Sequence, residues 1–389
     1  MALKSILVSI RDLLLYFSDS VFKLFSTKSL KESNQIAIVR MDAIGDFLLW
    51  HGFASAIRKH YSESRITFIC NKVVYDLVKT FPYFDTIIPI NVKDFRNKLK
   101  YRYSVLKSLQ NNQFEILLNP LYNRRENFID AESVVRLLKA KSKIGYNGER
   151  PQSHYKFISD KWYSQLIDSD NKQLMELERN SEFNAAIGIP DIKPDQLLIP
   201  IQLIPDYKIE SDNYYILFPG AGSTIRQWPV DKFAQIATEI YLKYKLTVVI
   251  CGGPGDKDLA KHLTNQLDVP FIDKTGQTSL PEFMGIIKKS RFLIGNETSA
   301  VHMAALLKVP SVCLLGGGHY KRFIPFVWQG KELNFSPHPV IHKMDCFNCN
   351  WKCIYNLQNN PVAPCISKIA SELVLKSISE FYINPNNEK

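Results

Sequence analysis

The sequence of 389 residues predicts an α/β protein made of two similar halves, each with a parallel sheet. Short apolar, β-branched runs alternate with stretches of helical periodicity, an order typical of β-α-β units. The alternation stops in a proline-rich segment, residues 188–212, and then starts again. A chain of this length is long enough for two domains. We therefore expect a ligand site in a cleft between them, faced by the carboxyl ends of the strands of both sheets.

The first half, which we place at residues 35–205, contains four strand-like runs. Ile36 begins the run IAIVRM, and apolar residues recur at helical spacing from Phe47 to about Tyr61. The pattern repeats with the runs RITFIC, TIIPI and EILLNP and with predicted helices at Val73–Thr80 and Lys93–Gln110.

The second half, residues 206–389, follows the same order and ends in a predicted helix. Its strand-like runs are YYILFPG, LTVVIC, FIDKT, RFLIGN and SVCLLGGG. The predicted helices between them are Val230–Tyr244, one that starts near Asp256, Leu280–Lys289 and Thr298–Leu307. The amphipathic stretch Ile366–Phe381 predicts a terminal helix.

Residues 1–34 form an extension that is apolar at helical spacing. Arg11, Asp12, Asp19 and Lys23 interrupt it, so no run of about 20 apolar residues could cross a bilayer. No convincing small-x-small cleavage site follows, so we expect no signal peptide and a cytoplasmic protein. Two interpretations stay open: an amphipathic helix that rests on the inner face of the cytoplasmic membrane, or a helix packed on the first domain.

An excess of basic residues suggests an anionic partner. The 49 Lys and Arg residues exceed the 38 Asp and Glu residues, for a net charge of +11. A nucleotide, a phosphorylated glycolipid, a membrane surface and nucleic acid would each fit this charge, which does not choose among them.

Two carboxylates flank a glycine where the first strand turns into a helix, in IVRMDAIGD. Ligands of open α/β sheets bind beyond the carboxyl ends of the strands, so Asp42 and Asp46 are expected at a ligand-binding edge. Gly45 permits the sharp turn. We interpret Asp42 as the cap of the helix, with the orientation of ligand hydroxyls as the alternative.

Every strand-to-helix turn of the second half suits an anion. Glycines let the backbone approach a phosphate, hydroxyls donate to it, a guanidinium grips it, and the free N–H groups of a helix start favour negative charge. The residues concerned are Gly222, Ser223, Thr224 and Arg226 in FPGAGSTIRQWP, Gly253 in CGGPGD, Gly276 in DKTGQTS, and Glu297, Thr298, Ser299 and Ala300 in GNETSAVHMAAL. One such turn can simply start a helix, but four on one sheet edge favour a phosphate-bearing ligand.

The pattern favours a nucleotide sugar as that ligand. No G-x-G-x-x-G follows IAIVRM and no G-x-x-x-x-G-K-[ST] occurs, which disfavours a dehydrogenase and a nucleotide triphosphatase. A transferase with one domain for the sugar donor and one for the acceptor remains. Arg226 and the helix start at Thr298 could stabilise a departing diphosphate, so we expect no metal in catalysis. The acceptor hydroxyl needs a base from the opposite domain, for which Asp42 and Asp46 are the candidates.

The sequence resembles glycosyltransferase family nine, the ADP-heptose:lipopolysaccharide heptosyltransferases, from Ile36 to about His319. The resemblance lies in five motifs in the family's order: IVRMDAIGD, FPGAGSTIRQWPVDKFAQIA, GGPGD, TGQTSLPEF and GNETSAVHMAALLKVPSVCLLG. It implies the GT-B fold, in which two Rossmann-like domains face each other across a cleft. It also implies inverting transfer of a sugar from a nucleoside-diphosphate donor to a lipopolysaccharide or other cell-surface glycan. Asp46 matches the family's catalytic base, and Arg226 matches the cation that binds the donor phosphate.

One motif departs from the family pattern. The family usually has Asp-Thr-Gly-Pro-x-His, whereas residues 297–302 are Glu-Thr-Ser-Ala-Val-His. We therefore expect rearranged donor contacts there, and a donor that need not be ADP-heptose. His302 is interpreted as a buried helix residue hydrogen-bonded to a neighbouring loop rather than as a catalytic group.

Four of the seven cysteines form a C-x2-C-x3-C-x11-C cluster within residues 346–365. Four thiolates at short spacings suit a tetrahedral site for zinc or iron, which we expect to be structural. The cluster consists of Cys346, Cys349, Cys353 and Cys365. A subset of the same family, the autotransporter heptosyltransferases, is similar in carrying a four-cysteine iron site, which makes a protein acceptor an alternative to a glycan.

Two other classes of protein are weaker explanations. A nucleic-acid-binding module would explain the net charge, the basic stretch Lys93–Lys107 and the thiol cluster, but not the repeated anion-suited turns. A nucleotide-sugar epimerase of the two-Rossmann type needs no acceptor domain. Nucleic acid is therefore not the partner that the sequence favours.

Overall fold

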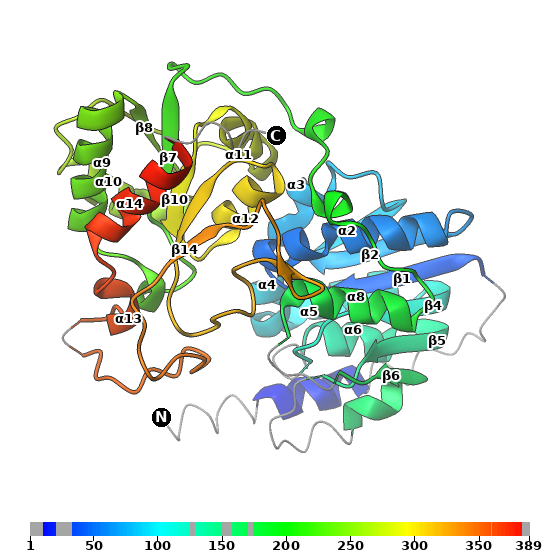
Figure 1. The fold of residues 1–389 in the computed structure, drawn as a ribbon. Coiled ribbons are helices and arrows are strands. Elements are labelled where there is room, and N and C mark those ends of the chain that lie inside the picture. Colours follow the sequence, from blue (N-terminus) through cyan, green and yellow to red (C-terminus); the bar gives the residue numbers. More distant parts are fainter. Residues whose placement is uncertain are drawn as a thin grey trace. The chain divides into compact units, whose positions relative to one another are not determined.

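The computed structural model describes residues 11–20, 33–124, 129–148, 158–169, 174–358 and 360–382. The chain divides into two compact units, each with its own sheet (Figure 1). The first unit comprises Met1–Phe47, Phe53–Lys172 and Arg179–Asp191, and the second comprises Leu48–Gly52, Gln173–Glu178 and Ile192–Lys389. The second unit thus begins before residue 206, where the sequence-based boundary lies. Apolar residues of the intervening segment explain the difference, because Leu197, Ile199 and Ile204 are buried and the Ile199 N–H donates to the Leu306 carbonyl.

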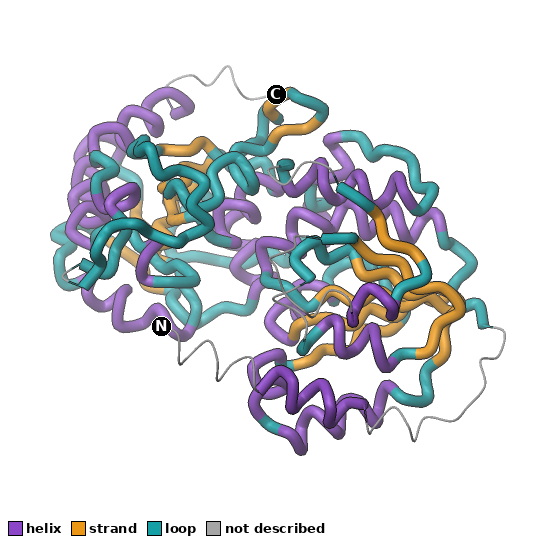
Figure 2. Tube along the Cα trace, turned by 90° about the horizontal axis from the view of Figure 1, so that it is seen from below, coloured by secondary structure: helices purple, strands orange, loops and turns teal. Residues whose placement is uncertain are grey.

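The first unit is built on a six-stranded parallel sheet in the order β3-β2-β1-β4-β5-β6. Its strands are β1 (Gln35–Arg40), β2 (Arg65–Asn71), β3 (Thr86–Ile90), β4 (Gln113–Asn119), β5 (Lys139–Tyr146) and β6 (Gln165–Ile167). Its helices are α2 (Ile44–His60), α3 (Tyr75–Val78), α4 (Val92–Asn97), α5 (Leu99–Leu109), α6 (Ala131–Leu137) and α8 (Glu176–Ala186), except that residues 48–52 of α2 and 176–178 of α8 are assigned to the second unit. Figure 2 shows these strands as a twisted stack between helices.

The central strand β1 explains why this sheet forms. Five of its six residues are buried, as a parallel strand covered on both faces requires. Its register pairs Ile36 with Ile66 of β2 and with Ile116 of β4, so β-branched residues line up across the sheet. On one face Ala37 and Val39 pack with Phe95 of α4 and with residues of α5 and α6 in one apolar core.

The second unit repeats the architecture with a six-stranded parallel sheet in the order β14-β11-β10-β7-β8-β9. Its strands are β7 (Tyr214–Phe218), β8 (Thr247–Ile250), β9 (Phe271–Asp273), β10 (Leu293–Asn296), β11 (Ser311–Leu314) and β14 (His338–Val340), with a separate hairpin of β12 (Val327–Trp328) and β13 (Lys331–Glu332). Its helices are α9 (Val230–Tyr244), α10 (Lys257–Thr264), α11 (Leu280–Lys289), α12 (Ser299–Leu306), α13 (Pro364–Ser367) and α14 (Ser371–Tyr382). Helices α9, α10 and α14 share one apolar core with the sheet.

The predicted terminal helix Ile366–Phe381 is wrong in its continuity. The chain forms α13 and α14 instead, with a break at residues 368–370. Two side chains of the second unit bind the carbonyls released by the break. Lys232 donates to the carbonyls of Ser367 and Ile369, and the Trp228 indole N–H donates to the Ile369 carbonyl at 3.1 Å.

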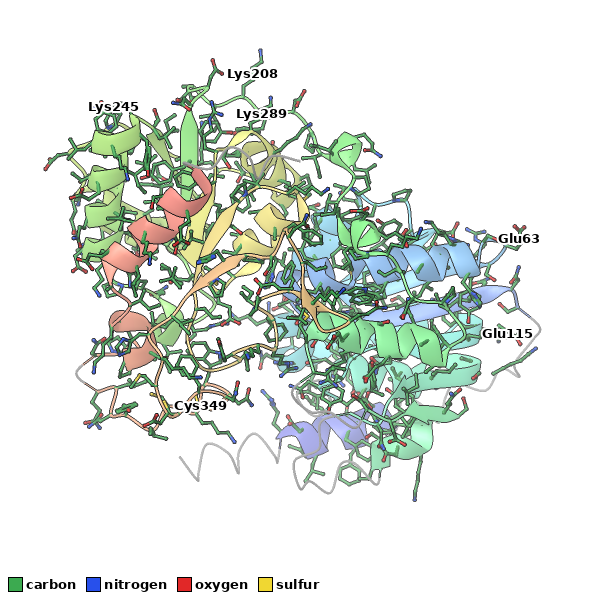
Figure 3. The ribbon with its side chains drawn as sticks, in the orientation of Figure 1. Glu63, Glu115, Lys208, Lys245, Lys289 and Cys349 are labelled. Atoms are coloured by element: carbon green, nitrogen blue, oxygen red, sulfur yellow. The ribbon has the colours of Figure 1, made fainter. Side chains whose placement is uncertain are left out.

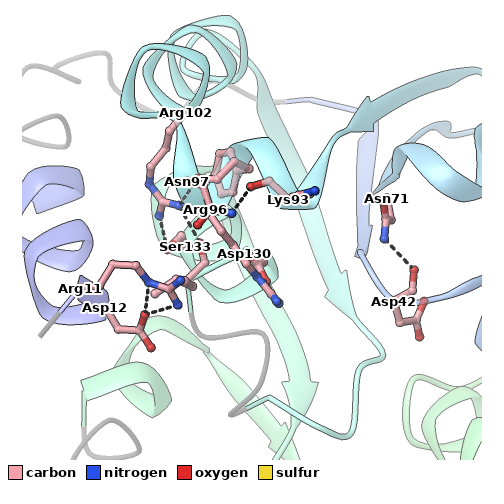
Figure 4. A network of polar contacts seen from close by, with 12 residues as sticks. Arg11, Asp12, Asp42, Asn71, Lys93, Arg96, Asn97, Arg102, Asp130 and Ser133 are labelled. Atoms are coloured by element: carbon pink, nitrogen blue, oxygen red, sulfur yellow. Dashed lines mark hydrogen bonds and ion pairs between the residues drawn. The ribbon is translucent and has the colours of Figure 1, made fainter. Parts of the chain in front are cut away.

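Residues 11–20 of the predicted N-terminal extension are helical and pack on the first unit (Figure 4). Asp19 is fully buried and pairs with the buried Arg102 of α5, with an Oδ1–Nε distance of 2.8 Å. Tyr16 lies under the guanidinium of Arg136 and stacks on Trp162. This face of the helix agrees with the packed interpretation. The rest of the predicted extension lies outside the described residues, apart from residues 33 and 34.

Candidate active site

The loop between β1 and α2 holds the predicted acidic pair, and it corrects one assignment. The N-cap position of α2 is Ala43 rather than Asp42. The carboxylate of Asp42 instead pairs with the guanidinium of Arg40, with an Nε–Oδ2 distance of 2.8 Å. Asp46, in the first turn of α2, accepts a hydrogen bond from the Ala43 backbone N–H at Oδ2, 3.2 Å away. The turn is therefore ordered by Asp46 and by the Arg40–Asp42 pair.

Arg40 is a member of this site that the sequence analysis missed. Its side chain is buried at the end of β1. It pairs with Asp42, donates to Asn180 Oδ1 at 3.2 Å and donates to the backbone carbonyl of Asp46 at 3.3 Å. Asn71 of β2 adds a hydrogen bond to the Asp42 carbonyl (Figure 4). A buried guanidinium that binds both acidic residues fixes the geometry of the loop.

In the second unit, the loops after β7 and β10 are joined by one buried amide. Asn296, the last residue of β10, donates to the Pro219 carbonyl at 2.7 Å. Its Oδ1 accepts a hydrogen bond from the Trp228 N–H at 3.0 Å. The loop that carries Gly222, Ser223, Thr224 and Arg226 is thereby held beside the loop that carries Glu297. Asn296 was not selected from the sequence, although it lies within the motif GNETSAVHMAAL, directly before Glu297.

A partly buried carboxylate contact joins the loops after β7 and β8. Asp256 accepts a hydrogen bond from the Gly253 N–H at 2.8 Å. A Cβ on Gly220 would lie 2.6 Å from an oxygen of Asp256, so only glycine fits there. The loop after β9 joins them through the Gly276 N–H, which donates to the Gly252 carbonyl at 2.9 Å. Three of the predicted glycine turns therefore lie together.

Glu297 is buried at the start of α12, where the charges of two cations act on it. Burial raises the pKa of Glu297 to about 7, against the opposing effect of the Arg226 and Arg322 guanidiniums. Its Oε2 and the Thr298 hydroxyl are buried without a hydrogen-bond partner among the described residues. Such atoms are costly unless a ligand or water satisfies them. Thr298 is the N-cap of α12, and Ser299 and Ala300 form its first turn, so free N–H groups lie beside these unpaired atoms.

Arg322 is a second cation that the sequence analysis did not select. It lies in the segment after β11, and its Nε is 3.8 Å from Glu176 Oε2. The backbone of the two residues is also joined, because the Glu176 N–H donates to the Arg322 carbonyl at 2.9 Å. The charge of Arg322 acts on Glu297 from this position. No motif marks it, since it is one of many basic residues in the chain.

His302 is buried on α12, which confirms that part of its interpretation. Its ring stacks on Phe326 with a centroid distance of 5.6 Å, and burial lowers its pKa to about 4. The expected hydrogen bond to a loop is not seen at Nδ1, which has no partner in the described part of the chain. The ring is therefore neutral at pH 7 and serves packing.

The four clustered cysteines lie in one neighbourhood of the second unit. Cys346, Cys349 and Cys353 are half-buried and Cys365 is buried. Burial raises the pKa of Cys365, and the charges of the other three thiols add to the increase. Within the described ranges, no three His, Cys, Asp or Glu side chains are arranged to hold a metal ion. The predicted metal site is thus not confirmed by the geometry and stays a proposal.

No helix that the structure describes is long and apolar enough to span a bilayer.

Comparisons with known proteins agree with these observations. Residues 102–340 match the family model of glycosyltransferase family 9 (heptosyltransferase). The chain is 23% identical over 300 residues to the lipopolysaccharide core heptosyltransferase OpsX of Haemophilus influenzae, covering 75% of this chain and 81% of that protein.

Two solved structures share the fold at low sequence identity. Escherichia coli heptosyltransferase WaaC with ADP aligns with a TM-score of 0.66 at 14% identity, over 89% of this chain and 99% of that one. The iron-containing dodecameric glycosyltransferase TibC of enterotoxigenic E. coli aligns with a TM-score of 0.53 at 12% identity, over 92% of this chain and 78% of that one. The two parallel-sheet α/β units thus match the GT-B heptosyltransferase architecture.

Proposed function

Because the chain belongs to glycosyltransferase family 9, and is therefore a glycosyltransferase, we propose that it transfers a heptose from ADP-heptose to a lipopolysaccharide or related cell-surface glycan, with inversion at the anomeric carbon. The observation that carries the proposal is the cluster of Arg226, Glu297, Thr298 and Arg322 at the carboxyl ends of the second sheet. The matched family, and relatives named as heptosyltransferases, support the choice of sugar.

The second unit would bind the donor diphosphate. Arg226 and Arg322 supply positive charge, and the N–H groups at the start of α12 supply donors for phosphate oxygens. Negative charge on the leaving nucleoside diphosphate grows as its bond to the sugar breaks. Cations and dipoles fixed in advance stabilise that charge without a metal ion.

Asp46 of the first unit would act as the general base. An acceptor hydroxyl oxygen attacks the anomeric carbon while Asp46 takes its proton, and the bonding pair of the sugar–phosphate bond leaves with the nucleoside diphosphate. Attack from the face opposite the leaving group inverts the anomeric configuration. Asp42, paired with Arg40, would hold the loop in place.

A donor screen tests this function. The purified protein is incubated with ADP-heptose, ADP-glucose or UDP-sugars and with truncated lipopolysaccharide cores, and the products are analysed by mass spectrometry. We expect an acceptor that gains one heptosyl group from ADP-heptose only. Failure of every nucleotide sugar, together with tight and salt-sensitive binding of a DNA duplex, would favour the nucleic-acid hypothesis instead.

We further propose that Cys346, Cys349, Cys353 and Cys365 hold a structural iron or zinc ion. The donor set fits in kind and number, and the Gly317 N–H already points to Cys365 Sγ at 3.5 Å, as is common at thiolate sites. The TibC structure is described as iron-containing, which supports iron as the ion. A protein is the alternative acceptor, on the resemblance of the cysteine cluster alone. Metal analysis should find about one ion per chain, lost in Cys349→Ser and retained in Cys251→Ala.

A peripheral contact with the inner face of the cytoplasmic membrane is the last part of the proposal. The outer face of helix 11–20 exposes Leu13, Leu14 and Phe17. The Ser18 hydroxyl contacts the Tyr103 hydroxyl of α5, a helix that also exposes Lys100 and Lys107. Apolar and basic side chains on neighbouring helices suit an anionic lipid surface.

Sedimentation with anionic vesicles tests the membrane contact. Phe17→Glu should weaken binding to phosphatidylglycerol vesicles. The matched control is Leu242→Glu, which alters a comparably exposed leucine on α9 of the other unit. If both variants bind the vesicles as well as the wild type does, the exposed face of helix 11–20 is not a membrane-binding surface.

A further inference from the structure

Three consecutive glycines after β11 are covered by two aromatic rings, and we call these three residues the glycine seat. Gly316, Gly317 and Gly318 are buried, and the rings of Phe347 and Trp351 lie directly on their backbone. A Cβ on Gly316 would lie 2.5 Å from Trp351 Cη2, and one on Gly317 or Gly318 would overlap the rings of Phe347 and Trp351. The absence of side chains in this loop is therefore what allows the cysteine-bearing segment to dock on it.

The docked segment is held by main-chain hydrogen bonds as well as by the rings. The Asn348 N–H donates to the Gly317 carbonyl at 2.6 Å, and the Asn350 N–H donates to the Gly318 carbonyl at 2.9 Å. Trp351 itself has a φ of 57°. A bulky residue persists in the left-handed region only when its surroundings hold it there, and such positions concentrate at functional sites.

The indole of Trp351 lies beside the guanidinium of Arg226. The Arg226 Cζ is 5.6 Å from the centre of the Trp351 ring, within the range of a cation–π contact. On another side, a Cβ on Gly222 would lie 2.7 Å from Arg226 Nη2. The charge of Glu297 also acts on this guanidinium. Arg226, which is partly exposed, thus lies beside a glycine backbone and an indole and near the Glu297 carboxyl group. Figure 3 shows Cys349, in the same segment as Trp351, at the opposite end of the second unit from Lys245.

We infer that Trp351 is a positioning residue of the donor site. Its indole holds the Arg226 guanidinium in the position in which it binds the donor diphosphate. The inference rests on the proposed role of Arg226. A free arginine side chain has many rotamers, and its ordering opposes ligand binding. Because the Trp351 indole already holds the guanidinium, less side-chain entropy is lost when the donor binds. The cysteine-bearing segment is then part of donor recognition rather than a remote structural element.

A double-mutant cycle on the full-length protein tests the inference, with ADP affinity measured by calorimetry. Trp351→Ala should weaken ADP binding by about 5- to 20-fold, the range of one cation–π contact with its preorganisation. Arg226→Ala should weaken it more. The double variant should bind ADP no more weakly than Arg226→Ala, because Trp351 acts through Arg226. Additive losses would overturn the inference.

Two further variants separate positioning from a loss of fold. Trp351→Phe keeps a ring on the glycine seat and should retain most of the affinity. Gly318→Ala displaces the ring without changing Trp351 or Arg226, and it should weaken ADP binding as Trp351→Ala does. Ile354→Ala, an exposed residue of the same segment, is the matched control and should bind like the wild type. Equal affinities of Trp351→Phe and Trp351→Ala would contradict the inference.

The same measurements distinguish this inference from the proposed function. If Arg226→Ala binds ADP normally, the donor role of Arg226 fails, and the inference fails with it. If Arg226→Ala binds weakly while Trp351→Ala binds normally, the donor role stands and only the positioning role of Trp351 is rejected.

Discussion

At the scale of single residues, Asp42 and Asp46 differ in what they contact. Both are partly exposed, but Asp42 pairs with the buried Arg40, whereas Asp46 accepts a hydrogen bond from the Ala43 backbone N–H on the first turn of α2. A general base needs access to the substrate hydroxyl, and a carboxylate paired with a buried guanidinium is a poor proton acceptor. The contacts thus separate two acids that look equivalent in the sequence.

Exchanging each aspartate for asparagine tests whether Asp46 is the general base and Asp42 a residue that orders the loop. Asp46→Asn should lower kcat by about 10²- to 10⁴-fold, because the variant lacks a proton acceptor. Its affinity for ADP should stay near that of the wild type. Asp42→Asn is the matched variant and should lose about tenfold or less, since it loosens the loop but leaves Asp46 in place. Steady-state kinetics and calorimetry measure both. A larger loss in Asp42→Asn would reverse the assignment.

Glu297 predicts a pH dependence of stability. Its pKa is about 7 in the folded protein, against an ordinary value of 4.5. Between these values the folded state holds a proton that the unfolded state has lost, so stability falls as the pH rises from about 4.5 to about 7. The loss amounts to about 3 kcal/mol at most. Glu297→Gln removes it, so the variant should gain thermal stability relative to the wild type between pH 5 and pH 8.

Calorimetric melting of the wild type and of Glu297→Gln at pH 5 and at pH 8 measures this difference in stability. Glu332→Gln, an exposed glutamate on β13, is the control and should melt like the wild type at each pH. A constant difference between Glu297→Gln and the wild type across the range would show that Glu297 stays ionised in the folded protein.

At the scale of secondary-structure elements, the helices of the second unit were more predictable than those of the first. Helices α9 and α11 have the bounds that apolar periodicity predicts, and the Ser279 cap marks the start of α11. Strand β5 was missed because its sequence, KAKSKIGY, alternates lysines with small residues and lacks a β-branched run. The break between α13 and α14 depends on Lys232 and Trp228, which are distant in sequence. Local patterns do not contain such contacts.

The candidate site shows the same limit of local patterns. The glycine turns and the start of α12 follow from motifs, because turn and helix-start chemistry is local. Arg40, Asn296 and Arg322 were missed because their roles depend on partners from other loops. A buried polar side chain that joins two loops is recognised only when both loops are in place.

The contact between the loops after β7 and β8 predicts the effect of a glycine substitution. Gly220→Ala would place a methyl group 2.6 Å from an Asp256 oxygen that the Gly253 N–H already holds. The loops must then separate, at a cost of about 1–3 kcal/mol. We expect a lower melting temperature and weaker ADP binding. Gly255→Ala is the control, since its Cβ would meet no atom within 4 Å. Equal behaviour of the two variants would show that the loops are not packed in this way.

At the scale of the whole molecule, stability divides between two units with separate cores. Helix 11–20 belongs to the first unit and is fixed there by the buried pair of Asp19 and Arg102. Arg102 also donates to the Ile129 carbonyl at 2.8 Å and to the Ser133 hydroxyl at 2.9 Å, so this one guanidinium ties the helix to α5 and α6. Helix 11–20 therefore stabilises the first unit, and this contribution is independent of any partner of its exposed face.

Removal of that buried charge should destabilise one unit and spare the other. Asp19→Asn leaves the Arg102 guanidinium buried without its counter-charge, and such changes cost about 3–5 kcal/mol. Hydrogen exchange followed by mass spectrometry should show faster exchange in peptides of α5, α6 and β4, with unchanged protection in β7, β8 and β10. Asp12→Asn is the control, because Asp12 pairs with the partly exposed Arg11 and should have little effect. Faster exchange in both units would show that they unfold together, and that the two cores are one cooperative structure.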